Sequence, residues 1–78
     1  MQAMELRDKT LKKLGLIIRQ SREAAALSQE ALADKADLDI TYISGIERGV
    51  HNPSILSLVS LAKGLKATVS KLVEGLER

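Results

Sequence analysis

Apolar residues recur along most of the chain at spacings of three and four, which is the period of an amphipathic helix. The first stripe predicts a helix over about residues 8–25, with lysines and arginines on its remaining faces, and the residues before Asp8 either extend this helix or fray. Its inward positions are Leu11, Leu14, Ile17 and Ile18. Leu, Ala, Lys and Glu dominate the composition, and all four residue types favour helices over strands. The pattern therefore predicts an all-α protein.

Polar breaks divide the rest of the chain into four further helical segments. Ser28, Asp39 and Ser54 each stand directly before an apolar stripe, where a side-chain oxygen can cap a helix. We predict helices from residue 28 to about 36, from 40 to about 48, from 54 to about 65 and from about 68 to 76. Thr68 or a neighbour begins the last one, and Gly49 is well placed to end the third in a left-handed conformation.

Length and composition exclude several classes of protein. The chain has 78 residues and no cysteine, so it is one domain without disulfides or thiolate metal sites. His51 is the only histidine and Tyr42 the only aromatic residue. The net charge is +2, no apolar run approaches ~18 residues, and the start is too charged for a secretory signal. We expect a cytoplasmic protein with no metal, cofactor or membrane partner.

The last two predicted helices hold more apolar residues than one small core needs. We expect the core to take Ile55, Leu58, Leu61, Leu65, Val69 and Leu72. This assignment leaves over Leu56, Val59, Val73 and Leu76. Monomers rarely expose a contiguous apolar patch, so these four residues predict a two-fold interface between identical chains.

Residues 28–48 form two short helices joined by a tight turn, the pattern of a helix-turn-helix unit. The second helix of such a unit enters the DNA major groove N-terminus first. Thr41 and Ser44 would then face base edges, because hydroxyls both donate and accept hydrogen bonds. Gly45 would let the backbone approach closely. The alternative is a packing motif with a solvated polar face and no ligand.

Residues 27–49, LSQEALADKADLDITYISGIERG, resemble the helix-turn-helix of the lambda repressor and Cro superfamily, often called the XRE family. The resemblance covers about residues 14–72 and includes the NPS segment and amphipathic helix that follow. A narrower similarity is to the controller proteins of restriction-modification systems, whose recognition helix often reads TYISGIERG. The resemblance implies a five-helix lambda-repressor-like domain spanning residues 1–78, with residues 54–76 serving the core and dimerisation.

The resemblance also implies roles for particular residues. Ser28 caps the second helix beside the DNA backbone and Gln29 touches a phosphate. Bases or phosphates are met by Thr41, Tyr42 and Ser44, and the backbone is clamped by Arg48, His51 and Asn52. For Tyr42 the alternative is packing over the turn, and for His51 it is plain solvation.

Two further pairs of residues match the family. Arg22 and Glu47 match a pair that forms an internal salt bridge. Glu30 and Asp34 match an acidic surface that lambda repressor shows to RNA polymerase, although such residues are most often an ordinary exposed helix face.

Three positions depart from the family pattern. Ile40 and His51 stand where controller proteins often have arginine, so the operator should differ, with Ile40 placed against a thymine methyl. Ala26 replaces the usual glycine between the first two helices. If that position is left-handed, Ala26 costs on the order of 1 kcal/mol.

These observations predict a homodimeric, sequence-specific transcriptional regulator that binds a pseudo-palindromic operator on double-stranded DNA. The narrowest form is an autoregulating controller of a restriction-modification system. The alternatives are a phage-type or chromosomal XRE repressor and a protein-interaction module such as an antitoxin. No cysteine nucleophile, glycine-rich phosphate loop or zinc spacing is present, so we expect neither an enzyme nor a small-molecule ligand.

Overall fold

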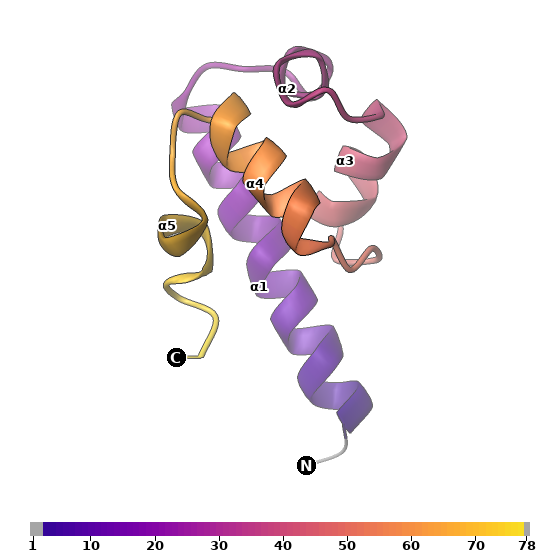
Figure 1. Ribbon diagram of the computed structural model, residues 1–78. Helices are drawn as coiled ribbons and strands as arrows, with labels where there is room; N and C mark the ends of the chain where they lie inside the picture. Colours follow the sequence, from indigo (N-terminus) through magenta and orange to yellow (C-terminus); the bar gives the residue numbers. More distant parts are fainter. Residues whose placement is uncertain (1–2, 78) are drawn as a thin grey trace.

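The computed structural model describes residues 3–77, which contain five helices and no strand (Figure 1). The helices are α1 (Ala3–Ala24), α2 (Gln29–Ala36), α3 (Ile40–Glu47), α4 (Ile55–Gly64) and α5 (Val69–Val73). The predicted all-α class and the order of the five helices are therefore confirmed. Most boundaries agree with the predicted ones to within a few residues.

Helix α1 begins at Ala3, about a turn earlier than the predicted start at Asp8. The added residues are good helix formers without proline or glycine, and Glu5 in the first turn suits the helix dipole. Met4 and Leu6 in this segment remain exposed. In Figure 1 the N-terminal part of α1 extends beyond the other helices, so tertiary packing does not fix its start.

The N-terminal caps predicted at Ser28, Asp39 and Ser54 are confirmed, and Thr68 also caps its helix. The Ser28 hydroxyl accepts a hydrogen bond from the Ala31 amide at 3.0 Å, and the Asp39 carboxylate accepts one from Thr41 at 2.7 Å. Ser54 and Thr68 cap α4 and α5 in the same way. Each side chain satisfies an amide that has no partner within its own helix.

The first four helices end in the same way, with one left-handed residue followed by a residue whose amide reaches back into the last turn. The left-handed residues are Ala26, Asp37, Gly49 and Lys66, with φ between 54° and 76°. The left-handed conformation was predicted for Gly49. Ala26 adopts it too, so its Cβ destabilises the folded state, as expected from the sequence for a left-handed residue at this position. Asp37 and Lys66 were not foreseen, because neither is glycine and each bears a Cβ that disfavours this region.

All five helices contribute to one core, whose least exposed side chains are Ile18, Leu32, Ile43, Ile46, Leu61 and Leu72. Helix α1 packs on α3 and α5, and α2 packs on α3 and α4. At Gly15 the backbones of α1 and α3 come so close that an added Cβ would lie 2.5 Å from two carbonyl oxygens of α3. The absence of a side chain at Gly15 therefore sets how α3 rests on α1.

The apolar surface of α4 and α5 differs from the predicted division. Ile55, expected in the core, is 63% exposed, because it stands four residues before the exposed Val59 and shares its face of α4. Val73 and Leu76, expected to be left over, pack partly against the core. Leu56 and Val59 do remain on the surface, with Leu56 76% exposed. The exposed apolar surface of α4 is thus formed by Ile55, Leu56 and Val59.

The left-handed Ala26 leads to a stability prediction. Ala26→Gly removes the Cβ strain of about 1–2 kcal/mol, and the greater freedom of glycine in the unfolded chain offsets part of this gain. We expect a net increase of about 0.5–1 kcal/mol in the free energy of unfolding, measured by urea denaturation. Ala24→Gly, inside the last turn of α1, is the control and should destabilise the protein. A loss of stability in Ala26→Gly would contradict the strain argument.

Candidate nucleic-acid interface

Helices α2 and α3 and the turn between them form the helix-turn-helix predicted from the sequence. Asp37 ends α2 in the left-handed conformation, Leu38 packs against the core, and Asp39 caps α3. In Figure 1, α2 is seen close to end-on at the top and α3 descends beside it. The turn is short because the residue that ends one helix is nearly adjacent to the residue that caps the next.

One face of α3 is buried and the other is available to a ligand. Ile43 and Ile46 point into the core and are almost fully buried. Ile40, Thr41 and Arg48 are exposed, and Ser44 is half-buried. The structure therefore places these four residues on one accessible side of α3.

A buried ion pair joins the end of α1 to the end of α3. The Arg22 guanidinium donates from Nε to Glu47 Oε2 at 2.7 Å and from Nη2 to Glu47 Oε1 at 3.0 Å. Its Nη1 donates to the carbonyl oxygen of Leu27 at 2.9 Å. The two side chains are only 13% and 3% exposed. The Arg22–Glu47 pair predicted from the family resemblance is thus present as a bidentate ion pair.

The same pair orients Gln29. The Gln29 side-chain amide donates to Glu47 Oε1 at 3.0 Å, so the first residue of α2 is tied to the last residue of α3. Within the described residues its carbonyl oxygen accepts no hydrogen bond, so this oxygen and the second amide hydrogen can serve a ligand. The Gln29 side chain is therefore held at the N-terminus of α2 with hydrogen-bonding groups that remain available to a ligand.

The hydrogen bonds to Glu47 raise the pKa of Arg22 above its ordinary value, although burial of the guanidinium acts in the opposite direction. A raised pKa means that the charged form of Arg22 is favoured in the folded state. The corresponding stability is present throughout the neutral range and is lost only as the pH rises through this folded-state pKa. The pair therefore gives no pH switch near neutrality.

Tyr42 and Gly45 have structural roles that the sequence did not settle. The Tyr42 hydroxyl donates to the Ser57 hydroxyl of α4 at 3.2 Å, and its ring centroid lies 5.6 Å from that of His51. An added Cβ at Gly45 would lie 1.9 Å from Cδ2 of His51. Gly45 is buried, so its missing side chain makes room for the imidazole and leaves no path for the close backbone approach that we expected. For Tyr42, the contacts support the packing alternative.

The loop after α3 presents Arg48, His51 and Asn52 to solvent. Its shape is fixed from both ends, because the Gly45 carbonyl accepts from the amides of Val50 and His51, and Gly49 lies against Lys12 of α1. These three polar residues thus follow directly on the exposed face of α3.

Sequence reasoning missed Arg19 at this surface. A depression of about 270 Å³ beside α3 is lined by Arg19, Arg22, Gln29, Ser44, Glu47 and Arg48. Arg19 lies outside the helix-turn-helix pattern, but its spacing of three from Arg22 places both on one face of α1 and was a usable signal.

Other predicted site residues lie away from this depression. Glu30 and Asp34 are exposed on α2, and Leu56 and Val59 are exposed on α4. The described residues contain no cluster of side chains that could hold a metal ion. No helix among them combines the length and apolar character needed to cross a membrane.

Comparison with protein families and known relatives gives one consistent result. The Helix-turn-helix family model matches residues 18–72. Control protein C.MunI from a Mycoplasma species is 42% identical over 73% of this chain and 77% of its own length. Control protein C.SmaI from Serratia marcescens is 41% identical over 72% of this chain and 67% of its own length. The regulator DdrOP3 of Deinococcus deserti is 38% identical, and the match spans 46% of its length.

Solved structures show the same fold. The restriction-modification controller protein C.AhdI from Aeromonas hydrophila has a TM-score of 0.78 at 40% identity, over 80% of this chain and 94% of that chain. The controller protein C.Esp1396I, in a tetramer bound to its natural 35 base-pair operator, also has a TM-score of 0.78. It is 41% identical over 87% of this chain and 90% of that chain. The chain therefore belongs to the XRE-type helix-turn-helix family that its sequence resembles.

Proposed function

We propose that this protein is a homodimeric, sequence-specific regulator of transcription that controls the genes of a restriction-modification system, its own promoter included. The proposal rests above all on the exposed side of α3. There Ser44 of α3 shares one depression with Gln29 and Arg48.

Helix α3 would enter the major groove with its N-terminus leading. Thr41 lies in its first turn and Ser44 one turn later, so both hydroxyls lie on the accessible side and can meet base edges. Ile40 is 43% exposed beside them and offers an apolar surface to a thymine methyl.

Phosphate contacts would flank the base-reading residues. Gln29 stands at the N-terminus of α2, where unpaired backbone amides and the helix dipole favour an anion. Ser28 caps the same terminus. On the other side Arg48, His51 and Asn52 are exposed where the chain leaves α3. Such contacts fix the protein's register on DNA, and the side chains of α3 read the sequence.

The exposed apolar surface of α4 supports a dimer. Ile55, Leu56 and Val59 form an exposed apolar face on a helix that does not contribute to the proposed base contacts. We propose that Leu56 and Val59 lie at the centre of the two-fold interface, with Val73 and Leu76 at its edge. Two copies would then place their recognition helices about one DNA turn apart, ~34 Å, on a pseudo-palindromic operator.

The controller role is favoured by the solved relatives. Both C.AhdI and C.Esp1396I are restriction-modification controller proteins, and C.Esp1396I binds its operator as a tetramer. The Bacillus phage phi105 immunity repressor is also similar, at 38% identity, which keeps a phage-type repressor as the second candidate. Exposed Glu30 and Asp34 on α2 would serve contact with RNA polymerase if the protein also activates transcription.

The DNA-binding proposal predicts a graded loss of affinity. An operator is first selected from a random-sequence library, and binding is then measured by gel shift. Ser44→Ala should lower discrimination between operator and altered operator, because it removes one hydrogen bond to a base, worth about 0.5–1.5 kcal/mol. Arg48→Ala should weaken binding to both duplexes alike, because phosphate contacts do not depend on sequence. Unchanged affinity in the triple variant Gln29→Ala/Ser44→Ala/Arg48→Ala would exclude the regulator reading.

The dimer proposal predicts a change in oligomeric state. Leu56→Glu places a charge at the centre of the proposed interface, where it would lose hydration without a partner. We expect a folded monomer in sedimentation equilibrium. Glu30→Gln, an exposed change on α2, is the control and should leave the dimer intact. A stable Leu56→Glu dimer would move the interface to another surface.

A further inference from the structure

Helix α1 borders the proposed DNA-binding surface, although it is not part of the helix-turn-helix. Arg19 lies one turn before Arg22 on α1, and both line the depression that also holds Gln29, Ser44 and Arg48. Three different helices therefore contribute to one polar depression. Arg19 comes from α1, Gln29 from α2, and Arg48 from the residue that follows α3.

The net charge of this depression is positive. Its lining holds three arginines and one carboxylate, and that carboxylate, Glu47, is matched by Arg22 in the buried pair. The other two arginines, Arg19 and Arg48, have no carboxylate partner within the lining, since Glu23, which pairs with Arg19, lies outside it. The N-terminus of the eight-residue helix α2 opens beside them through Gln29 and adds its partial positive charge.

Arg19 is only loosely held in the free protein. Its Nε lies 3.5 Å from Glu23 Oε2, and the two side chains are 60% and 55% exposed. Exposed pairs of this kind are weak and are screened by salt. The guanidinium can therefore leave Glu23 for a stronger anion at little cost. A planar guanidinium matches the oxygens of a phosphate better than an ammonium group does.

We infer that the depression seats a phosphate of the DNA backbone and that Arg19 donates to it, so that α1 adds a backbone contact outside the helix-turn-helix. The inference rests on the proposed DNA-binding function and adds a residue to it. Gln29, oriented by Glu47, and Arg48 would hold the same stretch of backbone from the other two helices. Since a phosphate is common to every sequence, Arg19 contributes affinity and register but no base discrimination.

The experiment measures how affinity depends on salt concentration. Each phosphate contact contributes about 0.9 to the slope of log K against log salt for duplex DNA, so Arg19→Ala should lower the slope of a dimer by about 1.8. At 0.1 M salt, affinity should fall by roughly tenfold per half-site, with operator and non-operator duplexes affected alike.

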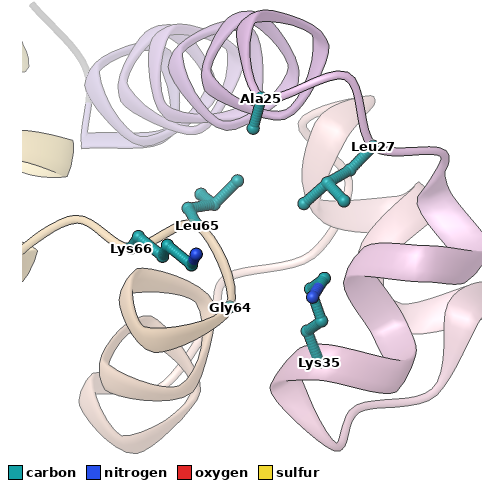
Figure 2. A pocket seen from close by; sticks show the side chains of 6 residues that line it. All are labelled: Ala25, Leu27, Lys35, Gly64, Leu65 and Lys66. Carbon is teal, nitrogen blue, oxygen red and sulfur yellow. The ribbon is translucent and has the colours of Figure 1, made fainter.

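Lys35→Ala is the matched control, because it removes the same charge from a different place. Figure 2 shows Lys35 beside a separate depression, bordered by the end of α4 and the segment that joins α1 to α2. The slope for this variant should equal that of the parent. Arg19→Lys, which keeps the charge but not the planar group, should keep the slope and recover only part of the affinity.

A second variant tests the same contact by freeing the Arg19 side chain from its ion pair with Glu23, which should strengthen DNA binding. Glu23→Gln removes the loose partner of Arg19, so affinity should rise, and the rise should be smaller when Arg19 is already alanine. Parent protein that binds no duplex would refute the proposed function itself. If the parent protein binds its operator and Arg19→Ala shows the same salt slope as the parent, only the assignment of a phosphate contact to Arg19 is overturned.

Discussion

The buried pair of Arg22 and Glu47 joins the three helices that form the proposed DNA-binding surface. It ties the last turn of α1 to the last residue of α3, holds the carbonyl of Leu27 in the connection to α2, and anchors Gln29. Burying two charges is costly, and removing one partner leaves the other uncompensated, at about 3–5 kcal/mol. The pair therefore fixes the relative position of three helices whose polar residues must act together.

The short helices depend on that framework. Helices α2 and α3 have eight residues each, a length that is unstable in isolation. Ser28 and Asp39 cap their starts, the core holds their apolar faces, and Gly15 lets α3 rest directly on α1. The accessible side of α3 can consequently be polar without loss of the fold, because stability comes from the opposite side and from the buried pair.

Signals that are local in sequence were enough to predict the starts of α2 to α5, the helix-turn-helix and the end of α3 at Gly49. The Arg22–Glu47 pair followed from the family resemblance, since its members lie far apart in the chain. Tertiary packing decided the rest: the exposure of Ile55 and the role of Gly45 beneath His51 depend on how helices meet. Arg19 was missed because the depression that it borders exists only after three helices assemble.

The most direct test compares Glu47→Leu with the double variant Arg22→Met/Glu47→Leu, measuring DNA affinity after the free energy of unfolding. Glu47→Leu should lose about 3–5 kcal/mol of stability, and the double variant should regain most of it, because paired apolar replacements are often tolerated. The account predicts that the restored double variant still binds DNA weakly, because Gln29 has lost its anchor and Arg22 its charge. A stable double variant with the parent's affinity would contradict the claim that this pair organises the binding surface.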